Sequence, residues 1–209
     1  MKKYIIPLMA IAAAMTFNLC SCTSTDTDNS FSSYNSTDKE TSSPNDAIQP
    51  FSDYFNAFIS GEGEKVILAT TPAVYIEQMN ADGTYNTLLT ETEDIVIKYT
   101  MKAWEEQYGN NISISPADIQ DVVELSSVQL DEAVQSYKIT YGDTSSEINI
   151  TEGYELTYSY TIGGSKTSED IIETSCFVKI ENDGWKMLPL TSADLKGYAE
   201  AINNLNSNQ

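Results

Sequence analysis

Three tyrosines on one predicted strand are the residues best placed to do chemistry. Tyr154, Tyr158 and Tyr160 alternate with polar residues between Gly153 and Ile162, and a period of two puts them on one face of a strand. A phenol hydroxyl can donate a hydrogen bond, so these side chains could line a pocket. They could equally fill a core with their hydroxyls at its rim. The alternation from Tyr154 to Ile162 places no carboxylate on the inward face, which argues against a proton-transfer enzyme.

Two tryptophans are weighed in the same way. Trp104 lies in a helical stripe with Met101 and Tyr108, a pattern typical of core residues, and is added to the tyrosines as a possible pocket residue. Trp185 follows Gly184 at the start of a predicted strand, where such a residue closes one end of a fold. Packing and ligand stacking are both open interpretations for these two side chains.

Composition excludes several kinds of site. The 209 residues include no histidine, which rules out Ser-His-Asp triads, Cys-His pairs and histidine-bearing zinc sites. No glycine-rich phosphate loop is present either. The formal net charge of −20 opposes binding to nucleic acid. We therefore expect no catalytic residue, no metal, no cofactor and no nucleic-acid partner.

The N-terminus has the pattern of an export signal. Lys2 and Lys3 precede an apolar run over residues 4–17 that is too short to span a bilayer with ease. The run ends in Leu19-Cys20-Ser21-Cys22, which resembles the bacterial lipobox: an aliphatic residue, two small residues and a cysteine.

The resemblance implies cleavage between Ser21 and Cys22 and a diacylglyceryl thioether on Cys22, so residues 1–21 would be a lipoprotein signal peptide. Two acyl chains anchor a protein stably, which predicts a location at the extracytoplasmic face of the cell membrane. The alternatives are an ordinary signal peptide and an uncut anchor.

Beyond the signal we expect two further regions. Residues 22–46 would be the lipidated cysteine and a disordered tether, because Ser, Thr, Asn and Asp dominate this segment. Residues 47–209 would be a single domain. Cys176 would be the one cysteine left in it, and we expect a small buried hydrophobe there.

Apolar residues at helical spacing predict most of the domain's remaining elements. A first helix would run from Ile48 to Ile59 with Pro50 in its first turn and Gly61 after its end. Further helical stretches are expected over 64–68, over 97–108 behind a capping box at 90–93, over 127–141 behind a capping box at 126–129, and after Thr191, with Leu195, Tyr198, Ile202 and Leu205.

The strands are predicted by alternation and by glycine turns. A short strand is expected over 84–89, and a longer one from Ile112 to Leu125 with an interruption at Pro116. A helix is the alternative for the part from Ile119 to Leu125. Turns at Gly163-Gly164 and at 182–184 would then fold residues 153–190 into a three-stranded antiparallel meander. Helices packed on an antiparallel sheet make an α+β domain.

The opening segment AIQPFSDYFNAFISGEGEKVILATTPAVYIEQM and the closing segment CFVKIENDGWKMLPL resemble the ends of nuclear transport factor 2-like domains. The resemblance covers residues 47–190 and implies a strongly curved antiparallel sheet wrapped around a long helix. The helices at 127–141 and after Thr191 are additions to that pattern. More narrowly, the chain is similar to small bacterial surface lipoproteins with one such domain and no assigned activity.

Three hypotheses for function follow. The first is a surface lipoprotein that binds a small apolar ligand or a protein partner without catalysis, and it predicts an aromatic-lined cavity with no buried carboxylate. The second is a structural or assembly domain, which predicts a filled interior and an exposed apolar patch. The third is an isomerase- or cyclase-like enzyme, as some members of the resembled fold are, and it predicts a buried acid facing a tyrosine hydroxyl across a void.

Overall fold

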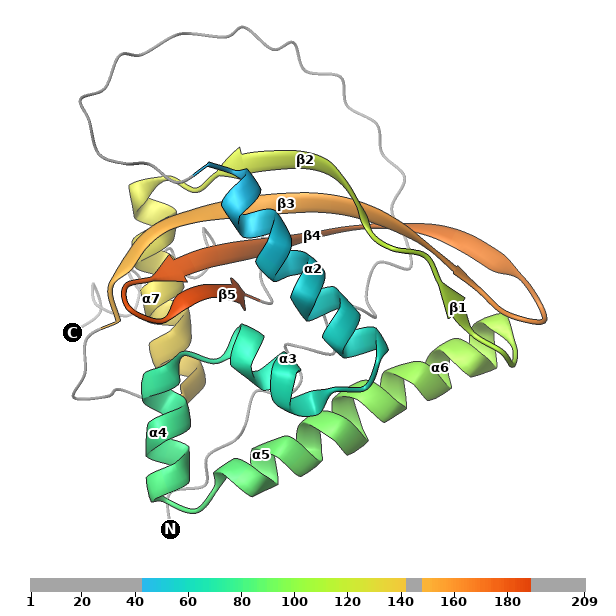
Figure 1. Ribbon diagram of the computed structural model, residues 1–209, viewed down its shortest axis with the longest axis horizontal. Coiled ribbons are helices and arrows are strands. Elements are labelled where there is room, and N and C mark those ends of the chain that lie inside the picture. Colours follow the sequence, from blue (N-terminus) through green and yellow to red (C-terminus); the bar gives the residue numbers. More distant parts are fainter. Residues whose placement is uncertain (1–42, 142–147, 189–209) are drawn as a thin grey trace, which may run out of the picture.

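The computed structural model describes residues 43–141 and 148–188, an α+β arrangement around a curled antiparallel sheet (Figure 1). Its elements are α2 (Asn45–Ile59), α3 (Gly63–Thr70), α4 (Ala73–Ala81), α5 (Tyr85–Glu91), the π-helical turn η1 (Thr92–Ile97), α6 (Lys98–Tyr108), β1 (Ser113–Ile114), β2 (Asp118–Glu124), α7 (Ser127–Tyr141), β3 (Ile150–Gly163), β4 (Ser168–Ile180) and β5 (Gly184–Leu188). The expected signal peptide, most of the tether and the helix after Thr191 lie outside the described residues.

The predicted meander forms the centre of the sheet. β3 pairs with β4 over nearly the full length of both strands, and β4 pairs with β5. The short β1 and the longer β2 both pair with β3 on its other edge, β1 near residues 162–163 and β2 along residues 154–159. Asn182 and Gly184 have positive φ angles of 63° and 82°, which explains why Asn and Gly occupy the β4–β5 turn.

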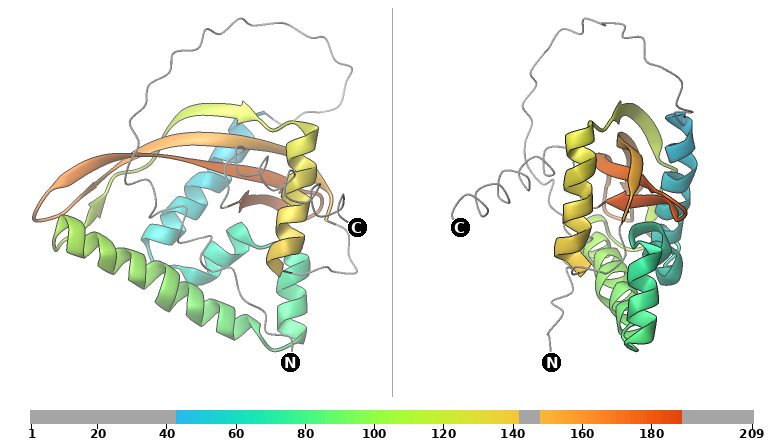
Figure 2. Two further views of the ribbon diagram at one scale, coloured as in Figure 1. Left: turned by 180° about the vertical axis from the view of Figure 1, so that it is seen from behind. Right: turned by 90° about the vertical axis from the view of Figure 1, so that its left-hand side faces the viewer.

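The two faces of the sheet are covered by different helices, as Figure 2 shows. We call the face toward α2 the inner face. It carries the predicted stripe Tyr154, Leu156, Tyr158, Tyr160 and Ile162, all of it buried. The opposite, outer face packs Cys176 and Val178 with residues of α7 such as Ala133 and Tyr137. Cys176 is therefore the buried hydrophobe that the sequence predicted.

Helix α2 contributes several aromatic side chains to the core on the inner face of the sheet. Phe51, Tyr54, Phe55 and Phe58 are all buried, and the Phe51 ring centroid lies 4.5 Å from that of Tyr158. The helix begins at Asn45, so Pro50 lies inside it and not in its first turn as predicted. Gly61 follows the helix with a φ of 75°, as expected for a C-terminal glycine.

The strand predicted over 84–89 is wrong, because these residues begin a long helical rod. α5, η1 and α6 run without a break from Tyr85 to Tyr108 (Figure 1). The capping box at 90–93 is also wrong: the Thr90 hydroxyl donates to the Asn86 carbonyl at 3.0 Å, a contact made inside a helix. Leu88, Val96 and Ile97 are buried, and this packing selects helix over strand.

The second predicted capping box is confirmed. The Ser126 backbone N–H donates to Gln129 Oε1 at 2.8 Å, and the Gln129 N–H donates back to Ser126 Oγ at 3.4 Å. These reciprocal contacts satisfy backbone donors at the start of α7. Local side-chain chemistry therefore sets where this helix begins.

Candidate functional site

A buried carboxyl group lies on the inner face of the sheet. Glu173 of β4 stands opposite Tyr158 of β3 in the strand register, and its side chain is 5 % exposed. The Tyr158 hydroxyl donates to Glu173 Oε2 at 3.2 Å and lies 3.3 Å from Ser175 Oγ. Tyr160 is also hydrogen-bonded to this carboxyl group. Glu173, Tyr158, Tyr160 and Ser175, together with Tyr54 of α2, are called the Glu173 cluster below.

Burial controls the protonation of this cluster. Loss of solvent raises the pKa of Glu173 to about 7, and the hydrogen bonds from Tyr158 and Tyr160 partly oppose that rise because they favour the charged form. Burial also raises the pKa of Tyr158 and of Tyr160, and the neighbouring Glu173 charge adds to both effects. At neutral pH Glu173 therefore exchanges a proton readily, while the tyrosines remain neutral donors.

Tyr54 is the fifth member of the cluster and the one whose hydroxyl makes no hydrogen bond to a described residue. Its hydroxyl is buried and has no hydrogen-bond partner among the described residues. Burial raises the pKa of this phenol, and the charge of Glu173 raises it further, so the two groups interact electrostatically. An unsatisfied buried hydroxyl costs about 1–3 kcal/mol. Within the described residues the hydroxyls of Thr92, Thr100 and Tyr137 are in the same state, but Tyr54 is the one in this cluster.

The expectation of an inner face without a carboxylate is wrong. It was drawn from residues 154–162 alone, and the acid comes from the neighbouring strand. Gly163 pairs with Ser168, and following that hairpin register back along both strands brings Glu173 opposite Tyr158. The register could have been read from the turn glycines, but the polar run Ser168-Glu169-Asp170 gave no sign that Glu173 is buried.

A cleft of about 580 Å³ opens between α2, α3 and the β4–β5 pair. Its apolar lining comes from Pro50, Tyr54, Ala57, Leu68, Ala69, Phe177 and Trp185, and its polar lining from Asp53, Asn56, Ser60, Glu62 and Lys65. Leu68 is about half exposed, so an apolar surface is accessible within this lining. Glu62 and Lys65 form an ion pair of 2.7 Å in the polar part of this lining.

The four predicted pocket residues lie in the core around the cleft and not in its lining. Tyr158 and Tyr160 belong to the Glu173 cluster. Tyr154 packs on Trp185 with ring centroids 5.8 Å apart, and Trp104 packs edge-on against Phe58. Of the two tryptophans weighed from the sequence, Trp185 is the one in contact with the cleft.

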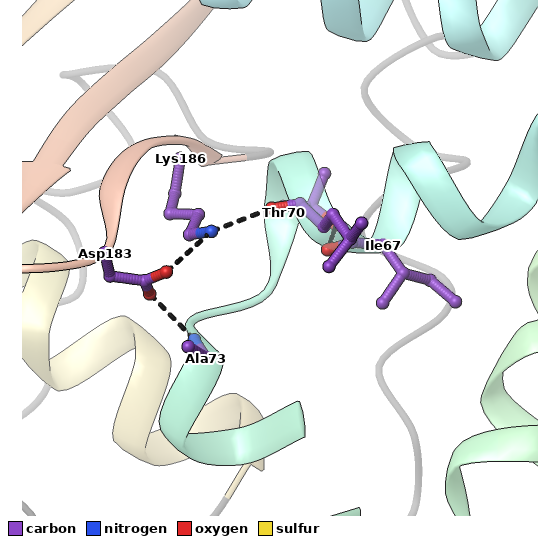
Figure 3. A network of polar contacts seen from close by, with 6 residues as sticks. Ile67, Thr70, Ala73, Asp183 and Lys186 are labelled. Carbon is purple, nitrogen blue, oxygen red and sulfur yellow. Dashed lines mark hydrogen bonds and ion pairs between the residues drawn. The ribbon is translucent and has the colours of Figure 1, made fainter. Parts of the chain in front are cut away.

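An ion pair fixes the helices beside the cleft (Figure 3). Lys186 Nζ lies 3.0 Å from Asp183 Oδ1 and donates to the Leu68 carbonyl, near the end of α3, at 2.8 Å. The other oxygen of Asp183 accepts from the Ala73 N–H, at the start of α4, at 2.7 Å. The β4–β5 hairpin thereby holds both helix termini, including the turn that carries Leu68.

Residues 43–141 and 148–188 contain neither a metal-binding cluster nor a membrane-spanning helix. No group of three or more acidic, cysteine or histidine side chains is placed there to hold a metal ion. No helix in these ranges has the length and apolar character of a membrane span. Comparison with protein-family models, with curated proteins and with solved structures finds no match for the chain.

Proposed function

We propose that this chain is a lipid-anchored extracytoplasmic protein whose domain binds a small apolar molecule, without catalysis, in the cleft between α2, α3 and β5. The observation that carries this proposal is the cleft itself, with Leu68, Phe177 and Trp185 among the residues that line it. A concave site with an apolar lining and a few polar groups is the usual form of a small-molecule site. The curled sheet with α2 across its inner face also supports a nuclear transport factor 2-like fold.

Binding can be tested with N-phenyl-1-naphthylamine, an uncharged apolar dye that fluoresces when it leaves water. We expect saturable binding that Leu68→Asp weakens about tenfold or more, since a carboxylate would then be desolvated by the dye. Val128→Asp is the matched control, because Val128 is 62 % exposed and lies at the start of α7, where an acid is tolerated. Equal binding by both variants would remove the cleft as the site.

The anchor rests on the sequence from Leu19 to Cys22 and has its own test. We expect mass spectrometry of the membrane fraction to find Cys22 as the first residue, with a diacylglyceryl group on its sulfur. Cys22→Ala should abolish that modification, and Cys20→Ala should leave it unchanged. An unmodified Cys22 in the mature protein would refute the anchor.

The Glu173 cluster favours a second candidate function, an isomerase- or cyclase-like enzyme. A carboxyl group with a pKa of about 7 beside two phenols is suited to moving a proton next to a carbonyl. Against this stand the direct 3.2 Å contact between Glu173 and Tyr158 and the absence of Glu173 from the cleft lining. The enzyme would be established if the protein turned over a ketone substrate and Glu173→Gln abolished that turnover while still binding the ligand.

A structural or assembly domain without a ligand is the third candidate. The interior between α2 and the sheet is filled by aromatic rings, as that hypothesis predicted. It requires a cleft that takes no apolar probe, so the dye experiment separates it from the proposal above.

A further inference from the structure

We propose that proton exchange at Glu173 opens and closes the ligand cleft, and that Tyr54 transmits the change. This inference rests on the proposed binding function and assigns a regulator to the same site. It comes from the arrangement of one side chain that belongs to both the cleft and the buried cluster.

Tyr54 connects the two places physically. It lines the cleft together with Phe177, and the centroids of the two rings lie 6.4 Å apart. Phe177, Ser175 and Glu173 occupy alternate positions of β4, so they follow one another along the inner face from the cleft inward. The Tyr54 hydroxyl is buried within the electrostatic reach of Glu173.

The hydrogen-bonding capacity of Glu173 changes with its charge. A neutral carboxyl group carries its own donor, and the two phenols of β3 that contact it satisfy most of its remaining capacity. An ionised carboxylate is acceptor only, with about four lone-pair sites, and in a dry core each unfilled site is costly. Tyr54 is the buried donor that is free to fill one of them.

Among the described groups that face Glu173, Tyr54 is the one hydrogen-bond donor left to stabilise its ionised carboxylate. From β3 they are Tyr158 and Tyr160, from α2 Tyr54, and Tyr108 of α6 acts on Tyr160 in turn. Tyr108 is itself engaged, since its hydroxyl donates to Glu169 Oε2 at 2.9 Å. No cation is among the described groups that shift the pKa of Glu173.

Movement of Tyr54 toward Glu173 would carry α2 with it. Pro50, Asp53, Asn56 and Ala57 of the same helix line the cleft, so drawing α2 toward the sheet narrows the gap between α2 and Phe177 and Trp185 of the β4–β5 pair. The unpartnered Tyr54 hydroxyl corresponds to the protonated, open state. Because burial places the pKa of Glu173 at about 7, the cleft should be open in acid and narrowed above neutral pH.

The chain is unusually suited to a test of this inference. It contains no histidine, the side chain that ordinarily titrates between pH 5 and 8. We would use the chain from residue 22 onward with Cys22→Ser, which needs no detergent, and measure dissociation constants for N-phenyl-1-naphthylamine at pH 5.5 and pH 8.5. A hydrogen bond to a charged group is stronger than one between neutral groups, so it can hold α2 in the narrowed position, and we expect binding about tenfold weaker at the higher pH.

The variants define the mechanism. Glu173→Gln and Tyr54→Phe should both bind the dye with the same affinity at the two pH values. Glu169→Gln, which removes an exposed carboxylate hydrogen-bonded to Tyr108, should keep the tenfold difference. A pH dependence that survives Glu173→Gln would overturn the inference while leaving the proposed binding function intact.

If the dye binds at neither pH, the proposed binding function is overturned. A second measurement then still tests whether Glu173 changes the cleft. Trp185 lines the cleft, so in protein labelled with 5-fluorotryptophan its ¹⁹F resonance reports on the cleft without a ligand. We expect this resonance to titrate near pH 7, and to lose that titration in Glu173→Gln. A Trp185 resonance that does not titrate in the unsubstituted protein would show that Glu173 leaves the cleft unchanged.

Discussion

Lys186 and Asp183 form a shielded ion pair at the β4–β5 turn, with 3.0 Å between Nζ and Oδ1 and side chains 8 % and 16 % exposed. Each charge also contacts a helix terminus, at the Leu68 carbonyl and at the Ala73 N–H (Figure 3). Both helix-terminal contacts have favourable sign, because a cation suits a helix C-terminus and an anion an N-terminus. The pair therefore joins two helices to the hairpin.

Removing one member of this pair should be costly. In Asp183→Asn the Lys186 ammonium stays buried without its counter-ion, and we expect the free energy of unfolding to fall by about 3 kcal/mol. The double variant Asp183→Asn/Lys186→Met should recover a large part of that loss. Urea denaturation measures both. The exposed pair Lys98–Asp94 is the control, and Asp94→Asn should leave the free energy of unfolding nearly unchanged.

Glu173 should make the stability of the domain depend on pH. Its pKa is raised from 4.5 unfolded to about 7 folded, so between these values the folded state holds a proton that the unfolded state has lost. The free energy of unfolding must then fall as pH rises through that window, by about 3 kcal/mol in total, and Glu173 adds no slope above it.

The measurement is the difference between the unsubstituted protein and Glu173→Gln. The general self-repulsion of an acidic chain also grows with pH, but it acts almost equally on both and cancels in the difference. Urea denaturation from pH 4.5 to pH 8 gives the free energy of unfolding of each protein as a function of pH. The difference between the two proteins should change by about 3 kcal/mol over this range. Parallel curves would mean that Glu173 is ionised in the folded protein throughout.

Local signals in the sequence predicted the elements whose ends depend on neighbouring residues. The tyrosine alternation identified the inner face of β3, and Ser126 with Gln129 identified the start of α7. The strand predicted over 84–89 is wrong because a short run that mixes Thr and Leu suits either a strand or a helix. Packing of Leu88 in the folded domain selects the helix.

The candidate site was harder to predict for a different reason. Glu173 follows Ile171 and Ile172 with no local sign that it is buried, and only its pairing across the hairpin with Tyr158 places it in the core. The cleft joins Tyr54 and Leu68 of two successive helices to Trp185 near the other end of the domain. Such sites depend on long-range contacts, which the periodicity of a single element does not contain.

The capping box of α7 provides a third prediction. Ser126→Ala removes the hydroxyl that contacts both the Gln129 side chain at 2.8 Å and the Gln129 N–H at 3.4 Å. We expect a loss of about 1 kcal/mol in unfolding free energy, typical of an N-cap. Ser126→Asp should restore most of it, since a carboxylate can accept the same bond. Hydrogen exchange of the first turn of α7 should rise in Ser126→Ala and return toward normal in Ser126→Asp.

The β3–β4 loop rests against the end of α6, and Gly164 lies in this contact. A Cβ on Gly164 would lie 2.6 Å from the Tyr108 carbonyl oxygen and 2.9 Å from that of Gly109, both backbone atoms that cannot turn aside. The Lys166 N–H donates to the same Tyr108 carbonyl at 2.8 Å, closing the C-terminus of the helix. Gly164→Ala must therefore push the hairpin away from α6 and break this bond.

We expect Gly164→Ala to lower the unfolding free energy by about 2–3 kcal/mol, the range for a steric clash in a packed region together with a lost hydrogen bond. Gly83→Ala separates this clash from backbone strain. Gly83 has a φ of 72° but open space around its missing Cβ, so its substitution should cost about 1 kcal/mol from strain alone. Thermal and urea unfolding of both variants test the ranking, and an equal loss at the two positions would contradict the close approach of the hairpin to α6.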